Sequence, residues 1–198
     1  MLVIGLTGGV GVGKDEAAKV LKRHGAEIID ADKTGHRLLE KNRELYKRLI
    51  EIFGNKIVSR KKIDRKKLGA AVFGNKKKLA QLDKAIHPLM KKEFQKEIAV
   101  YRKQGKKLVI LNAAVLFEAG WDKIVDKIIL VAASKTLRIK RLNKRGIDRK
   151  KALAMISSQW SDAVKKKKSD FIINNNSSIG DLRKKVEYTF RQIRLHPN

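Results

Sequence analysis

Short apolar runs alternate along this chain with segments of helical periodicity. The runs predict β-strands at residues 2–6, 27–29, 108–111, 128–131 and 171–173. The later runs are continuous, which is typical of parallel strands buried on both faces. Between the first two strands, apolar residues at helical spacing predict a helix over 15–24, which Gly25 ends as a C-cap. The order strand, helix, strand predicts a βαβ opening and an α/β fold.

The remaining periodic segments are helical. From 33 to 104 the spacing predicts helices only, with Pro88 just inside a helix start. This block is too long for a simple crossover, so we interpret it as an inserted substrate-binding subdomain. A further helix over 137–156 is divided by Gly146, and a closing helix has Ser178 as its N-cap. The residues that this closing helix is expected to bury are Ile179, Leu182, Val186, Phe190 and Ile193.

A glycine-rich segment joins the first strand to the first helix. Residues 8–14 read Gly-Gly-Val-Gly-Val-Gly-Lys and match the pattern G-x-x-x-x-G-K of a phosphate-binding loop. Such a loop points its backbone N–H groups and the N-terminal end of a helix at phosphate oxygens, and Lys14 would reach the β- and γ-phosphates. The alternative is a glycine-rich hairpin with an incidental lysine. The position that normally carries a hydroxyl is Asp15.

Two further pairs of charged residues are candidates for chemistry. Asp30 and Asp32 follow the second strand and would face the same way in an extended segment, suited to a general base or a magnesium ligand. The alternative is a pair of helix N-cap aspartates. Arg141 and Arg145 lie four residues apart beside Gly146, as mobile lid arginines over a phosphoryl group would. A solvated basic face explains this pair equally well.

Three polar residues remain as weaker candidates. His87 precedes Pro88, where a capping or core role is the commoner explanation for a lone histidine. Asn112 and Glu118 follow the third strand, where α/β kinases keep groups that orient metal-bound water. Asn112 has no basic group to offer, so we expect it to position other groups only.

Composition limits the protein class. The net charge is +28, from 48 basic and 20 acidic residues, which suits either nucleic-acid binding or a solvated lysine-rich surface. We favour the second, because the basic residues are interleaved with apolar helix positions without aromatic stacking groups, so nucleic acid is not the expected partner. The chain has no cysteine, which excludes disulfides and thiol catalysis. No apolar stretch approaches the ~20 residues of a membrane span, so we expect no membrane association and a cytoplasmic protein.

Taken together, the chain resembles the dephospho-coenzyme A kinase family nearly from end to end. The shared segments are 4–14 with the glycine loop, Asp30-Ala31-Asp32 with His36, Ile63-Asp64-Arg65, Ile86-His87-Pro88-Leu89, Leu116-Phe117-Glu118, Arg141-Leu142 with Arg145-Gly146, Gln159, and Ile173-Asn174-Asn175-Asn176. The resemblance implies a P-loop NTPase-type three-layer α/β/α fold with a five-stranded parallel sheet, a helical substrate-binding insertion and a helical lid. It also implies one kinase domain over 1–198. The core would comprise about 1–33, 105–137 and 169–198, the coenzyme A-binding subdomain about 34–104, and the lid about 138–168.

The resemblance further implies ATP and dephospho-CoA as substrates, with the γ-phosphoryl group passing to the 3′-hydroxyl of the ribose in the final step of coenzyme A synthesis. Asp32 would be the general base, and Lys14, Arg141 and Arg145 would act on the phosphates. The ATP-binding positions would be Gly8, Gly9, Gly11, Val12, Gly13, Lys14, Asp15, Glu16, Asn174 and Asn175. The substrate side would hold Asp30, Asp32, Arg65, His87, Phe117 and Glu118.

Several positions depart from the family pattern. Residues 112–116 stand where an acid followed by Pro-Leu-Leu is more common, and Met155 stands where arginine is frequent. Asp15 replaces the hydroxyl that normally ligates magnesium. A carboxylate can also ligate Mg²⁺ and would repel a metal-free triphosphate, so we expect strict magnesium dependence, with Asp15 and Asp32 as candidate ligands.

Two other functions stay open at this point. One is a kinase on the same scaffold with another acceptor, such as a nucleoside monophosphate. The other is a basic nucleic-acid-binding protein that has lost catalysis, which the net charge and Asp15 both permit. The sequence carries no indication of oligomeric state.

Overall fold

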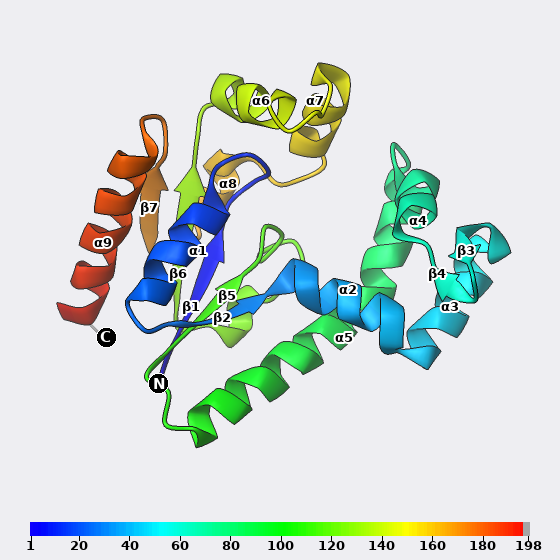
Figure 1. The fold of residues 1–198 in the computed structure, drawn as a ribbon, viewed down its shortest axis with the longest axis horizontal. Helices are drawn as coiled ribbons and strands as arrows, with labels where there is room; N and C mark the ends of the chain where they lie inside the picture. The colour runs from blue at the N-terminus through cyan, green and yellow to red at the C-terminus, as the bar shows by residue number, and fades with distance from the viewer. Residues whose placement is uncertain (196–198) are drawn as a thin grey trace. The chain divides into compact units, whose positions relative to one another are not determined.

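The computed structural model describes residues 1–195, which form two compact units (Figure 1). The first comprises Met1–Ile29 and the chain from Ile98 onward, and the second comprises Asp30–Glu97. The strands of the main sheet are β1 Leu2–Thr7, β2 Glu27–Asp30, β5 Leu108–Asn112, β6 Lys127–Ala132 and β7 Phe171–Asn174. The helices of the first unit are α1 Lys14–Arg23, the 3-10 turn η2 Asp122–Ile124, α6 Lys135–Asn143, α7 Arg149–Ser157, α8 Asp162–Lys166 and α9 Ile179–Leu195.

The main sheet has the order β2-β5-β1-β6-β7, which confirms the predicted α/β fold with a five-stranded parallel sheet. β1 is central, with Leu6 paired to Asn112 of β5 and Thr7 paired to Leu130 of β6. Because the strands are parallel, their carboxyl ends share one edge. The register therefore places Asn112 beside the start of the glycine loop.

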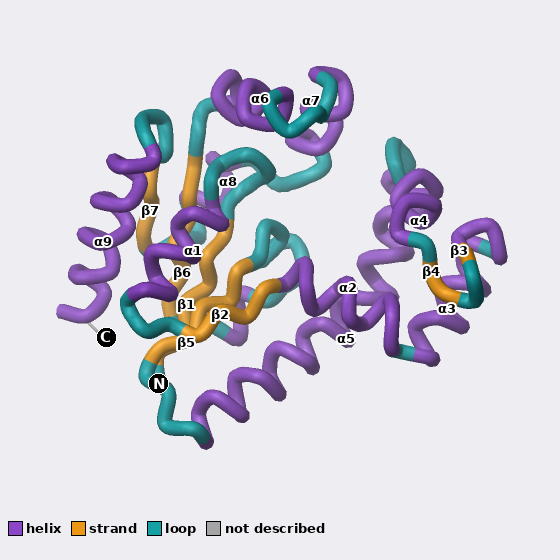
Figure 2. Tube along the Cα trace, viewed as in Figure 1, coloured by secondary structure: helices purple, strands orange, loops and turns teal. Residues whose placement is uncertain are grey.

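Both faces of the sheet are covered. Ile4 and Leu6 point into a core with α1 and α9, which lie side by side (Figure 2). Gly5 faces the other side, where a Cβ would come 2.7 Å from Leu116 Cδ2 in the segment after β5. This close approach leaves no room for a larger residue at position 5 and brings the segment after β5 tightly against β1.

The second unit is helical apart from one hairpin. Its elements are α2 Ala31–Lys41, α3 Arg43–Phe53, the 3-10 turn η1 Asn55–Ile57, β3 Val58–Ser59, β4 Lys62–Ile63 and α4 Arg65–Val72, with α5 Lys76–Lys103 running on into the first unit. The prediction of helices only was therefore wrong at β3 and β4. The hairpin turn uses positive φ at Arg60 (48°) and Lys61 (62°), and neither residue type signals such a turn.

The prediction of a helix start at Pro88 was also wrong, because Pro88 lies inside the 28-residue α5. Proline removes one backbone donor there, but the flanking apolar residues Ile86 and Met90 are buried and keep the helix in place. In α9, Ser178 is the N-cap as predicted, whereas Ile179 is 56% exposed instead of buried, because the helix only begins there. Within residues 1–195 no helix is long and apolar enough to cross a membrane.

Candidate functional site

The glycine loop connects β1 to α1 with left-handed backbone at several positions. Gly11 has φ +80° and Gly13, the N-cap of α1, has φ +91°. At Gly8 a Cβ would collide with the carbonyl oxygen of Val131 on β6. Glycine is therefore required by conformation at two positions and by close backbone approach at the third.

The start of α1 differs from the other helix starts. In the described chain, the remaining eight α-helices each begin with an Asp, Asn or Ser side chain that accepts a hydrogen bond from a backbone N–H of the first turn. α1 begins with Gly13 and has no side-chain cap. No side-chain acceptor therefore competes with an anion at this helix start, although the N–H of Glu16 already donates to the Gly13 carbonyl at 3.1 Å.

Lys14, Asp15 and Asn112 form a polar cluster beside this helix start. Lys14 Nζ donates to Asn112 Oδ1 and lies 3.4 Å from Asp15 Oδ1, while Asn112 Nδ2 donates to the same Asp15 oxygen at 3.3 Å. Burial raises the pKa of the Asp15 carboxyl, but the charge of Lys14, the bonds from Asn112 and Lys14, and the charge of Arg145 outweigh it, so the pKa lies below its ordinary value. Asp15 is therefore ionised at neutral pH.

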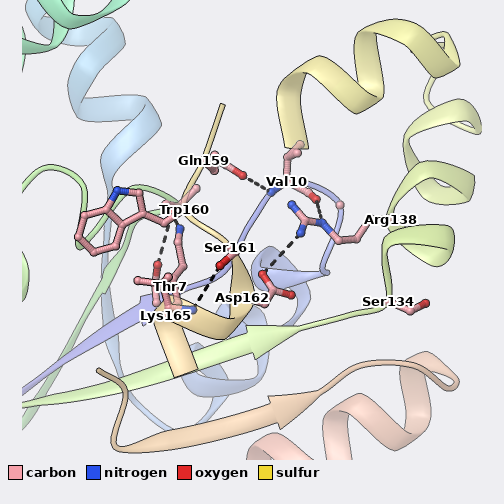
Figure 3. A network of polar contacts seen from close by, with 12 residues as sticks. Thr7, Val10, Ser134, Arg138, Gln159, Trp160, Ser161, Asp162 and Lys165 are labelled. Carbon is pink, nitrogen blue, oxygen red and sulfur yellow. Dashed lines mark hydrogen bonds and ion pairs between the residues drawn. The ribbon is translucent and has the colours of Figure 1, made fainter. Parts of the chain in front are cut away.

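Val10, in the middle of the loop, is held through both of its backbone polar groups (Figure 3). Its N–H donates to Gln159 Oε1 at 2.9 Å, and its carbonyl accepts from Arg138 Nε at 2.8 Å. Arg138 is buried and also lies 3.5 Å from Asp162 of α8. Gln159, between α7 and α8, and Arg138 of α6 thus hold the peptide groups of Val10 in the phosphate loop.

A buried ion pair anchors α8 to the chain after β5, and its lysine, Lys165, is labelled in Figure 3. Lys165 Nζ lies 2.9 Å from Glu118 Oε1 and donates to the carbonyl of Ala114 at 2.7 Å. Glu118 Oε1 also accepts from the N–H of Trp160, whose ring stacks on Phe117 with centroids 6.4 Å apart. Two residues predicted on the substrate side, Phe117 and Glu118, are therefore engaged in packing α8 against the sheet.

The predicted lid arginines lie in different environments. Arg141 donates to the carbonyls of Gly11, Val12 and Asn175 at 3.4, 3.3 and 3.1 Å, so it supports the loop from behind. Arg145 follows α6, is exposed, and acts on Asp15 through its charge.

The two asparagines predicted near adenine also differ. Asn175 is buried and donates to the carbonyl of Val12 at 2.7 Å. Asn174 is exposed, and its carbonyl accepts from Lys185 at 2.9 Å. Asn175 thus joins Arg141 in supporting the loop carbonyls, while Asn174 lies at the exposed end of β7.

The remaining predicted residues belong to the second unit. Asp30 is the N-cap of α2 and accepts from the N–H of Lys33 at 3.1 Å, and Asp32 is exposed in the first turn. The expectation that both carboxylates lie in an extended segment was wrong, because the strand ends at Asp30 and the helix begins at Ala31. Arg65 begins α4 and is exposed, and His87 Nε2 lies 3.4 Å from Asp83 one turn earlier in α5.

Neither Arg138 nor Lys165 is among the residues predicted from the sequence. Arg138 contacts Val10, 128 positions earlier in the chain, and no local pattern signals such a contact. Lys165 stands four residues after Ser161, the N-cap of α8, and this spacing on a short helix was the one available signal.

The comparisons with known proteins agree with this geometry. Residues 2–181 match the family model for dephospho-CoA kinase. The chain belongs to this family. Dephospho-CoA kinases from Fusobacterium nucleatum and Dehalococcoides mccartyi are 41% and 39% identical to it, over 94% of this chain and 96% and 95% of theirs. The solved structure of dephospho-CoA kinase from Campylobacter jejuni is similar with a TM-score of 0.71 at 30% identity, covering 96% of each chain.

Membership of the dephospho-CoA kinase family confirms the resemblance and favours a kinase over a nucleic-acid-binding protein that has lost catalysis. The intact loop and its uncapped helix fit a family of ATP-using enzymes. Within residues 1–195, no three His, Cys, Asp or Glu side chains gather closely enough to hold a metal ion by themselves.

Proposed function

We propose that this chain transfers the γ-phosphoryl group of ATP to the 3′-hydroxyl of the ribose of dephospho-CoA, the last step of coenzyme A synthesis. The observation that carries the proposal is the start of α1, which has no side-chain cap and directly follows a glycine loop with positive φ angles, in a chain of this family. Backbone N–H groups of the loop and of the start of α1 would bind the phosphates. Lys14 would neutralise the β- and γ-phosphates as charge develops in transfer.

We assign different roles to Arg141 and Arg145. Arg145 is exposed and its charge already reaches Asp15, so it is suited to close over the γ-phosphoryl group. Arg141 is bonded to three carbonyls, and we assign it the support of the loop. Asn174 and Asn175 would lie toward the adenine end of the site, as the resemblance implies.

Acceptor activation is assigned to Asp32, which is exposed and belongs to the unit that carries Asp30, Arg65 and His87. A carboxylate within hydrogen-bond reach of the ribose hydroxyl would take its proton during transfer. The helical unit over Asp30–Glu97 would bind dephospho-CoA. Since Glu118 is paired with Lys165 and Phe117 stacks on Trp160, we assign both to holding α8 rather than to the chemistry.

Magnesium fits the donor set next to the loop. The Asp15 side chain is 71% exposed in the first turn of α1, and a carboxylate oxygen is a ligand that Mg²⁺ prefers. We propose that Asp15, with Asp32 as a second candidate, holds the ion, with phosphate oxygens and water as the other ligands. Bound magnesium would neutralise charge on the phosphate oxygens. Asp15 would repel ATP when the metal is absent, which makes ATP binding strictly magnesium-dependent.

The activity is tested by measuring ADP release with and without dephospho-CoA, with the product identified by mass. We expect dephospho-CoA-dependent ADP release, and a fall in kcat of about 10²–10⁴-fold in Asp32→Asn. Glu44→Gln is the matched control, because Glu44 is an exposed acid in the first turn of the next helix, α3. ADP release with nucleoside monophosphates but not with dephospho-CoA would overturn the proposal.

The magnesium assignment has its own test. Asp15→Ser replaces the carboxylate by the hydroxyl usual at this position of the loop. We expect this variant to bind metal-free ATP more tightly than the natural chain does and to need a different magnesium concentration for half-maximal turnover. An unchanged magnesium requirement together with unchanged turnover would refute the role of Asp15.

A further inference from the structure

We propose that Asn112 is a positioning residue that keeps the Lys14 ammonium available to ATP despite the carboxylate next to it, and that residues 15 and 112 work as one charge-matched pair. This inference rests on the proposed function for its ligand, ATP. It concerns how this chain combines a loop lysine with an acidic residue at the following position. Asn112 is the last residue of β5, is buried, and pairs in register with Leu6 of β1, two residues before the loop begins at Gly8.

The orientation of the Asn112 amide follows from its two partners. Its Oδ1 faces the ammonium of Lys14, which can only donate, and its Nδ2 faces the carboxylate of Asp15, which can only accept. Reversing the amide would place donor against donor and acceptor against acceptor. Both ends of one buried side chain are thus assigned to two oppositely charged neighbours.

The contact lengths show what this arrangement does. Lys14 approaches Asn112 Oδ1 more closely than it approaches Asp15 Oδ1, from which it is 3.4 Å away. A charge-assisted hydrogen bond between ammonium and carboxylate is normally about 2.7–2.9 Å long. The neutral amide therefore takes the place of the carboxylate as the main acceptor of Lys14, and the direct ion pair stays loose.

Charge explains why an amide is needed at position 112. Lys14 and Asp15 together carry no net charge, and the Arg145 charge acts on the same carboxylate. A second carboxylate at 112 would lie against Asp15, hold Lys14 between two anions and turn the cluster negative. A triphosphate would then meet a site of its own sign before any metal binds. The amide provides the same geometry without the charge.

The same reasoning connects two departures in the sequence. Asp15 stands at the hydroxyl position of the loop, and Asn112 stands where the resemblance leads one to expect an acid. The two side chains are hydrogen-bonded to each other at 3.3 Å. We therefore infer that the carboxylate expected at position 112 is replaced by the carboxylate at the contacting position 15. Restoring either position alone should therefore unbalance the site, and restoring both should rebalance it.

A double-mutant cycle tests the pair directly. The dissociation constant of ATP is measured by calorimetry in EDTA, without dephospho-CoA, for the natural chain, Asp15→Ser, Asn112→Asp and the double variant. We expect Asn112→Asp to weaken metal-free binding by about tenfold or more, since like charges in contact are strongly unfavourable. In the Asp15→Ser background the same Asn112→Asp change should weaken binding by no more than about threefold, because the carboxylate at position 15 that it would repel is gone. Effects of the single changes that simply multiply in the double variant would overturn the proposal.

Asn112→Ala supplies a second cycle in case the added charge at position 112 prevents folding. Without the amide, we expect Lys14 to pair directly with Asp15 and metal-free ATP binding to weaken about fivefold, as for the loss of one charged hydrogen bond. In an Asp15→Ser background the same alanine change should have a clearly smaller effect. An equal effect in both backgrounds would contradict the positioning role, and thermal unfolding of each variant separates it from general destabilisation.

The outcomes separate this inference from the proposed function. Coupling between 15 and 112 in ATP binding, without phosphorylation of dephospho-CoA by the natural chain, would support the pair and reject the function. Dephospho-CoA-dependent ADP release with independent effects at 15 and 112 would support the function and reject the pair. Neither measurement depends on the result of the other.

Discussion

Lys14 and Lys165 each lie beside a carboxylate, but the two pairs are built in opposite ways. Lys165 is fully buried, and Glu118 lies 2.9 Å from it with its side chain 15% exposed. Lys14 is 11% exposed, Asp15 is 71% exposed, and the two are 3.4 Å apart. The first pair also has a carbonyl and a backbone N–H as partners, whereas the second shares one neutral amide. A pair that is closed and buried holds structure, and a pair that is open and loose can exchange its partner for a phosphate.

The largest effect, on the free energy of unfolding, is expected from breaking the Lys165–Glu118 pair. Lys165→Met would leave the Glu118 carboxylate buried without its cation, and we expect the free energy of unfolding to fall by about 3–5 kcal/mol. Lys166→Met, at the exposed next position of α8, should change it by less than about 0.5 kcal/mol. Denaturant unfolding followed by circular dichroism measures both. Adding Glu118→Gln to Lys165→Met should recover part of the loss, and equal losses in the two lysine variants would contradict the role of the buried pair.

Breaking the Lys14–Asp15 pair should instead lower activity and leave stability almost unchanged. Lys14→Met removes the charge expected on the phosphates, and we expect kcat/KM to fall by about 10²–10³-fold with a change in unfolding free energy below about 1 kcal/mol. Lys19→Met is the matched control, because Lys19 is exposed on the same helix and pairs with Glu16 at its surface. Steady-state kinetics and denaturant unfolding are run on the same samples. A large loss of stability in Lys14→Met would show that this pair, too, is structural.

The third prediction tests whether the region around Lys165 and Glu118 is connected to the region around Lys14 and Asp15 through the glycine loop. A Cβ at Gly9 would collide with the Arg138 guanidinium and lie 3.1 Å from Gln159 Oε1, so Gly9→Ala should disturb the hold on Val10. We expect ATP binding to weaken about tenfold, since the loop N–H groups would lose their orientation. Gly69→Ala is the control, because the added methyl would meet nothing within 4 Å in helix α4. Unchanged ATP binding in Gly9→Ala would show that the region around Lys165 and Glu118 does not influence the ATP site through the loop.

The Lys14 and Lys165 pairs also show how much of the fold and the site could be predicted from the sequence. The strands and the loop were predictable, since apolar runs and the G-x-x-x-x-G-K spacing are local signals, and Lys14 follows from that spacing. The bond between Asp15 and Asn112 was not, because it depends on the register of β5 beside β1 across 97 positions. The burial of Lys165 was not predictable either, since it stands in a run of four lysines that carries no signal for the one that turns inward. The hairpin at Arg60 and Lys61 was missed because its turn lacks glycine and asparagine.

The smallest expected effect concerns protons at the open pair. The charge of Lys14 and the bond from Asn112 outweigh burial and lower the pKa of Asp15, so the folded chain binds this proton less readily than the unfolded chain. The resulting stabilisation is complete above the ordinary carboxyl pKa of about 3.9 and is lost as the pH falls through the lower folded value. Between pH 5 and 8 the natural chain and Asp15→Asn should therefore differ in stability by a constant amount. In an NMR titration, Lys14→Met should move the Asp15 pKa upward, because the charge of Lys14 is the first cause that lowers it; an unchanged value would mean that Asn112 and Arg145 alone set it.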